Sequence, residues 1–133
     1  MKKLALLFSV VALFFIVNVA TSQTLSFCES VDSKGNPSGE SSTFNIPSGG
    51  GYFHFLVKLP YTVDCTQVNY EIYDVYSDYS ENYNTSINQD GIGKNWTWFW
   101  KKVTFYTAGY YHVYVKDCYG STIASSYLTI NMK

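Results

Sequence analysis

The amino-acid sequence predicts an all-β fold organised as a sandwich of two antiparallel sheets. Apolar and polar positions alternate along 110–115, so Tyr111, Val113 and Val115 lie on one face of a strand. Turn residues at 117–120 separate this strand from a second apolar run at 123–130, which predicts a β-hairpin. No long helical pattern interrupts the short strands and turns, and this combination favours a sandwich.

Taken in order, the chain contains about seven candidate strands bounded by turn residues or by the proline that ends the third. The strands are expected at 24–31, 42–46, 52–59, 66–76, 96–105, 110–115 and 123–130. Their inward-facing parities predict a core of Phe53, Phe55, Val57, Val68, Tyr70, Ile72, Phe105, Tyr111, Val113 and Val115.

The segment 66–83 has two interpretations. Tyrosine recurs there at a spacing close to that of one helix face, which predicts a short helix at 74–83. The β-branched residues of the same segment favour a strand that runs into a tyrosine-rich loop, and we adopt this interpretation. The polar, glycine-containing stretch 82–95 is then expected to be a loop.

A sheet-to-sheet crossing is expected just before Tyr111. Val103 and Phe105 share a parity in the preceding strand, and Ala108-Gly109 interrupts the ladder. A buried tyrosine after such a crossing can donate its hydroxyl to the corner backbone. The pattern therefore predicts a tyrosine corner at Tyr111.

The segment 103–130 resembles the C-terminal half of PKD-type and other bacterial immunoglobulin-like domains. The resemblance is carried by Val103-x-Phe105, Gly109, Tyr111-x-Val113-x-Val115 and Gly120. The wider immunoglobulin-like class fits better than the PKD type, because Val103 stands where the PKD pattern has a polar aromatic residue. The resemblance implies an immunoglobulin-like antiparallel β-sandwich and a role as a spacer, an adhesion module or a carbohydrate-binding appendage.

The N-terminus has the features of a bacterial secretory signal peptide. Two lysines precede an apolar run at 4–17 that is too short for a good membrane span, and Ala20-Thr21-Ser22 fits a cleavage site. We therefore expect residues 1–22 to be a signal peptide and residues 23–133 to form a single domain. The mature protein is expected to be secreted, periplasmic or at the cell surface, without an integral membrane segment.

The charge of the chain argues against nucleic acid as a partner. All nine basic residues are lysines, and removal of Lys2 and Lys3 leaves seven against ten acids, a formal net charge of −3. Binding to nucleic acid or to anionic lipid needs clustered positive charge.

Three cysteines, at 28, 65 and 118, are expected in an oxidising compartment. Cys65 follows the strand at 52–59 and Cys118 follows the strand at 110–115, and these two loops share one end of the predicted sandwich. We predict a Cys65–Cys118 disulfide. Pairing of Cys28 with either partner remains an alternative, because Cys28 could also lie at that end, and the absence of any bridge is a third.

The sequence predicts a protein without catalytic machinery, metal or cofactor. His54 and His112 lie opposite the core parity on strands of different sheets, so each is expected to be a surface residue that shares no metal with the other. The sequence lacks a Gly-x-Ser-x-Gly elbow, a His-Glu-x-x-His motif and a phosphate loop. Asn88-x-Asp90-Gly91 is similar to a calcium loop, but the frame places Thr97 where a bidentate glutamate is needed.

Trp96, Trp98 and Trp100 are the candidate ligand-binding residues. Carried back from Val103, the strand register turns all three indoles outward, where a row of rings can stack on sugars or anchor a protein. The alternative is that a bulge or a covering loop removes them from solvent. We expect a secreted non-catalytic binding or structural module of a bacterial surface or extracellular space, with a glycan or protein partner; the alternative is a carbohydrate-binding module that uses an exposed tryptophan row.

Overall fold

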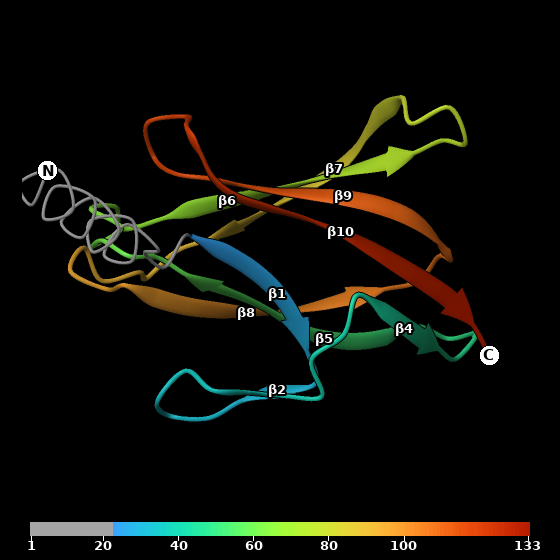
Figure 1. The fold of residues 1–133 in the computed structure, drawn as a ribbon, viewed down its shortest axis with the longest axis horizontal. Helices are drawn as coiled ribbons and strands as arrows, with labels where there is room; N and C mark the ends of the chain where they lie inside the picture. The colour runs from blue at the N-terminus through green and yellow to red at the C-terminus, as the bar shows by residue number, and fades with distance from the viewer. Residues whose placement is uncertain (1–22) are drawn as a thin grey trace, which may run out of the picture.

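The computed structural model describes residues 23–133, so the expected signal peptide lies outside the described residues. Two sheets pack face to face, with a small two-stranded hairpin beside them (Figure 1). Residues 23–133 contain no helix, and hence none that could cross a membrane. The strands are β1 (Thr24–Cys28), β2 (Ser30–Val31), β3 (Pro37–Ser38), β4 (Thr43–Ile46), β5 (Gly51–Lys58), β6 (Val68–Val75), β7 (Glu81–Gln89), β8 (Trp98–Phe105), β9 (Gly109–Lys116) and β10 (Thr122–Met132).

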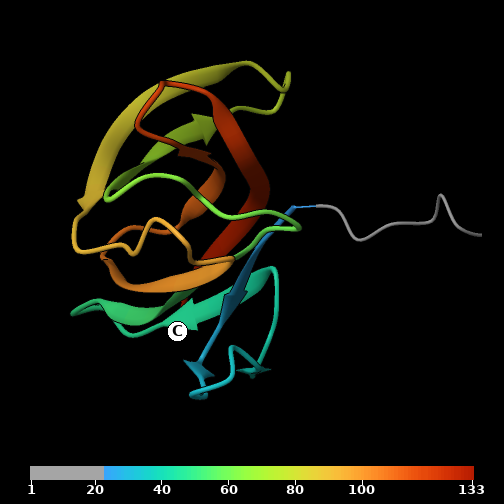
Figure 2. The ribbon, with the colours of Figure 1, turned by 90° about the vertical axis from the view of Figure 1, so that its left-hand side faces the viewer.

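The strand order is that of an immunoglobulin-like sandwich. One sheet has the order β1-β5-β8 and the other the order β4-β10-β9-β6-β7. The first part of the chain is divided between the sheets, with β1 in one and β4 in the other, and β7 adds an edge strand beside β6. The pairs are antiparallel except β4 with β10, which is parallel. Figure 2 shows the two layers from the side.

The core lies between the sheets, and every residue predicted for it is buried. Tyr111 forms the predicted tyrosine corner, since its hydroxyl donates to the carbonyl of Thr107 at 2.8 Å. Gly109 leaves room for this ring, because a Cβ there would lie 3.0 Å from the ring of Tyr111. The period-two pattern thus placed the core correctly.

The sequence predicted a loop at 82–95, but most of this stretch forms β7. Its side chains are nearly all exposed, so the segment buries no face that would impose an apolar alternation. Backbone pairing with β6 from Val68↔Gln89 to Val75↔Glu81 holds the strand instead. The alternative helix at 74–83 does not form either, since β6 runs to Val75 and a turn follows it.

The predicted Cys65–Cys118 disulfide is present, and Cys28 is a buried free thiol. Cys28 is the last residue of β1 and pairs with His54 in the middle of β5, whereas Cys65 follows the end of β5. The alternative pairing of Cys28 with Cys65 or Cys118 therefore does not occur, because these two cysteines are bonded to each other.

The β2–β3 hairpin crosses the outer face of the β1-β5-β8 sheet (Figure 1). The strand expected at 24–31 is thus divided into β1 and β2, and β3 lies in a stretch where no strand was expected. Hydrogen bonds anchor the hairpin: the imidazole Nδ1 of His54 lies 2.8 Å from the carbonyl of Glu29, and the amide of Glu29 donates to Ser38. Leu56 has the outward parity of β5, yet its side chain is fully buried. This outer face thus has a small apolar layer of its own.

Candidate functional site

A cavity of about 550 Å³ lies along β8, and all three candidate tryptophans line it. Its volume is within the range of small-molecule sites, about 300 to 1,000 Å³. Every residue of the lining is uncharged. The lining consists of Gln89, Gly91, Asn95, Trp96, Thr97, Trp98, Phe99 and Trp100.

Trp96 does not belong to the strand, contrary to the expected strand start. It closes a turn in which its amide donates to the carbonyl of Gly93, and its indole packs on the Cα of Gly93, where a Cβ would lie only 2.5 Å from it. The loop after β5 holds this turn, because Val63 donates to Trp96 and Asp64 to Lys94. The disulfide at Cys65 ties that loop to the β9–β10 loop, so a covalent bond supports one wall of the cavity.

Trp98 points outward from β8, as predicted, but it is half-buried. The tip of the β2–β3 hairpin packs on its indole: Gly35 is buried there with φ of 83°, and a Cβ at this position would lie 2.8 Å from the Trp98 ring. The three indoles therefore do not form a flat, free strip. The covering segment is this hairpin, not a bulge or the tyrosine-rich segment.

Trp100 is the most accessible indole of the strand, with 42% of its area exposed. Its ring meets the imidazole of His54 edge to face, at a centroid distance of 4.9 Å. Its carbonyl accepts a hydrogen bond of 2.8 Å from Gln89 Nε2, and Gln89 Oε1 accepts one of 2.6 Å from the buried Tyr70 hydroxyl. These bonds set the orientation of the Gln89 amide at the rim of the cavity.

Sequence reasoning identified the tryptophans but not Gln89 or Asn95. Gln89 reaches the site because β7 is a strand, and that strand was expected to be a loop. Asn95 precedes Trp96 in the turn, and its only signal was adjacency to the tryptophan row.

The two histidines lie in different sheets, as predicted, but His112 is not a surface residue, because only 9% of it is exposed. It points away from the core, and its neighbours on the same face cover it: the Tyr127 ring stacks on it at 4.0 Å and the Tyr114 ring lies at 4.1 Å. Its Nδ1 is 2.8 Å from a carboxylate oxygen of Glu81. Parity gives the direction of a side chain, whereas exposure also depends on adjacent strands.

No protein-family model matches the chain, and a comparison with curated protein sequences finds no match. Among solved structures, the chain is similar to an immunoglobulin-like protein from Pseudomonas aeruginosa, with a TM-score of 0.49, 11% sequence identity, and coverage of 86% of this chain and 100% of that one. The assignment to the immunoglobulin-like class rests on the strand order and the tyrosine corner described above.

Proposed function

We propose that this protein is a non-catalytic binding module of a bacterial surface or extracellular space, exported after removal of residues 1–22. The lining of the β8 cavity is the observation that carries the binding function: three indoles beside amide and hydroxyl groups, all uncharged. The Cys65–Cys118 disulfide is compatible with an extracellular or periplasmic location.

Within this function we propose a neutral saccharide as the ligand. Indole rings offer large apolar faces for the C–H faces of sugars, and the amides of Gln89 and Asn95 can exchange hydrogen bonds with hydroxyl groups. A charged ligand would lose its hydration without gaining an ionic partner in this lining. Because Trp98 is partly covered, Trp96 and Trp100 are the expected stacking residues.

Affinity electrophoresis tests this function. The gels contain a neutral polymer, namely β-glucan, mannan or an uncharged soluble chitin derivative, and polygalacturonate serves as the acidic comparison. Retention by at least one neutral polymer should be lost in Trp100→Ala, at an unchanged melting temperature. Tyr52→Ala is the matched control, since Tyr52 is an exposed aromatic residue of the same sheet that lies outside the cavity.

A wild-type protein that no neutral polymer retains, or a Trp100→Ala variant that is retained equally, would contradict saccharide binding at this site. A spacer without a ligand would then be the better description. Trp98→Ala is the less informative variant, because its contact with Gly35 makes a loss of stability expected as well.

A further inference from the structure

The outer face of the β4-β10-β9-β6-β7 sheet carries a continuous row of aromatic side chains that crosses four strands. Consecutive ring centroids in the row lie between 4.0 and 5.7 Å apart. We call this surface the tyrosine face. In order of ring contact, its members are Tyr83, Tyr73, Tyr114, His112, Tyr127 and Tyr110.

The tyrosine face is open to solvent. Tyr83 exposes 54% of its area, Tyr127 44% and Tyr110 40%. Contiguous aromatic surface of this kind is uncommon on soluble proteins unless it serves an interaction, and tyrosine is enriched where proteins bind one another. The face is separate from the tryptophan cavity, which lies along the other sheet.

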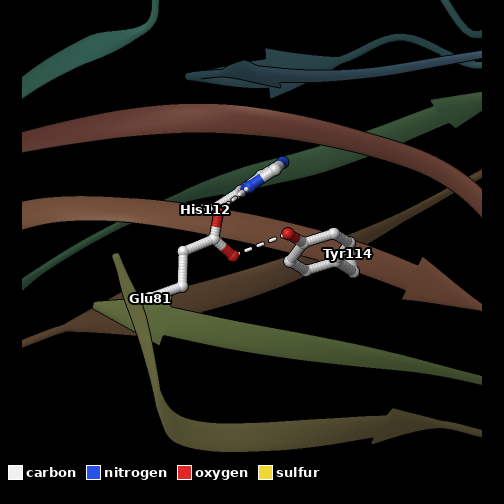
Figure 3. A network of polar contacts seen from close by, with 3 residues as sticks. All are labelled: Glu81, His112 and Tyr114. Carbon is white, nitrogen blue, oxygen red and sulfur yellow. Dashed lines mark hydrogen bonds and ion pairs between the residues drawn. The ribbon is translucent and has the colours of Figure 1, made fainter. Parts of the chain in front are cut away.

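Three tyrosines of this face, Tyr73, Tyr83 and Tyr114, donate their hydroxyl protons to groups of the face itself. Tyr73 donates to Glu71 at 3.1 Å, Tyr114 donates to Glu81 at 2.6 Å, and Tyr83 donates to the Ser86 hydroxyl at 3.2 Å. Figure 3 shows Glu81 joined to both Tyr114 and His112. The oxygens of these three phenols and of the Glu71 and Glu81 carboxylates therefore remain as hydrogen-bond acceptors.

The charges of the same region favour a cation. The β6–β7 hairpin, 68–89, contains no lysine, arginine or histidine. Two of its four acids, Glu71 and Glu81, accept hydrogen bonds from tyrosines of the face, whereas Asp74 lines a cavity on the inner side of the sheet with Tyr111. Lys116 on β9 already lies 5.8 Å from the centroid of the Tyr114 ring, within the range of a cation–π contact. Acceptors, aromatic rings and negative charge together match the donor-rich guanidinium and ammonium groups.

We propose that the tyrosine face docks a segment of a protein partner that carries exposed arginine or lysine side chains. Tyrosine supplies rigid contact area at a low entropic cost, and Glu71 and the β6–β7 hairpin supply charge complementarity. The partner's cations lie against the part of the face formed by Tyr73, Tyr83 and Glu71.

Fluorescence anisotropy with a labelled peptide of alternating arginine and glycine tests this docking, with an alternating glutamate and glycine peptide as the charge-reversed probe. The arginine peptide should bind the wild-type protein, more tightly at low than at high ionic strength. Glu71→Gln keeps an acceptor for Tyr73 but removes the charge, and Tyr83→Ser removes an exposed ring. Each substitution should weaken binding about tenfold.

Two matched variants serve as controls: Tyr52→Ser removes an exposed tyrosine of the other sheet, and Glu40→Gln removes an exposed acid outside the hairpin. Both should bind as the wild type does, and so should Trp100→Ala, which separates this surface from the saccharide site. Equal binding by all variants, or no binding by the wild type, overturns the proposal. A loss of peptide affinity in Tyr83→Ser without a loss in Glu71→Gln also overturns it. So does a homodimer in analytical ultracentrifugation that Tyr83→Ser dissociates, since that result assigns the face to a second copy of the chain.

Discussion

The buried residues on the outer faces of the two sheets are shielded from solvent in different ways. On the β1-β5-β8 sheet, a backbone segment, the β2–β3 hairpin, crosses the strands, and Leu56 and Cys28 are fully buried on that face. On the β4-β10-β9-β6-β7 sheet, His112 is buried because neighbouring side chains on the same sheet lean over it. Burial under backbone excludes solvent over a whole patch, whereas burial among neighbouring side chains leaves those neighbours exposed. Substitutions of side chains buried on the first face, such as Leu56, should therefore affect mainly stability, whereas substitutions of the exposed rings on the second face should affect mainly binding.

The largest expected effect is that of Leu56→Ala. The substitution leaves a cavity in a layer where the leucine has no exposed area, so the free energy of unfolding should fall by about 3 kcal/mol. Urea unfolding followed by tryptophan fluorescence measures it. Tyr52→Ala, also on β5 but 61% exposed, should cost less than about 1 kcal/mol. Equal costs for the two variants would show that the hairpin does not pack on this face in solution.

The predictable residues of this fold were those of strands that have the core on one side and solvent or polar neighbours on the other. Tyr111, Val113 and Val115 alternate because the core lies on a single side of their strand, so parity alone located them. The strand β7 gives no such signal, since its two faces are about equally exposed and its partner is a backbone edge. The tryptophans of the site were visible in the sequence, but the cover of Trp98 comes from Gly35, distant in the chain, whose neighbourhood indicates only a turn.

Gly35→Ala tests the cover of the first face, because it disturbs only the tip of the β2–β3 hairpin. Gly35 has φ of 83°, and a Cβ there would lie 2.8 Å from the Trp98 ring, so both backbone strain and a clash oppose the substitution. Gly120→Ala is the matched control: its φ is 84°, but nothing lies within 4 Å of the added Cβ. Strain should cost about 1 to 2 kcal/mol in either variant.

Thermal unfolding should show a larger loss of stability for Gly35→Ala than for Gly120→Ala. Only Gly35→Ala should change the tryptophan fluorescence of the folded protein. The difference between the two variants isolates the contact of the hairpin with Trp98. Identical losses and identical spectra would mean that this contact contributes nothing.

Tyr127→Ser tests whether neighbouring side chains bury His112. The ring of Tyr127 stacks on His112 at 4.0 Å, and its loss should cost about 1 kcal/mol while leaving the core intact. In proton NMR, the imidazole resonances of His112 should shift and those of His54, in the other sheet, should not. Tyr119→Ser is the control, since Tyr119 is an exposed tyrosine of the β9–β10 loop. If the His112 resonances were the same in both variants, neighbouring rings would not be what shields the imidazole.

The smallest expected effect, and the most specific, is the pH dependence of the contribution of Glu81 to the free energy of unfolding. Hydrogen bonds from His112 and then from Tyr114 hold the pKa of this carboxyl below its ordinary value. Because the pKa is lower in the folded state, the stabilisation is present above the unfolded-state pKa of about 4.3 and is lost as the pH falls through the folded-state pKa. Glu81→Gln removes the charge, so the difference in unfolding free energy between wild type and variant, measured in urea, should shrink on acidification.

The same comparison in a His112→Phe background should show a weaker dependence on pH, since the side chain at 112 then has no donor for Glu81, whose largest influence comes from His112. A difference between wild type and Glu81→Gln that stays constant into acid would separate Glu81 from the His112 network. The carboxylate would then act on the tyrosine face only through its bond to Tyr114, and His112 would owe its burial to Tyr114 and Tyr127 alone.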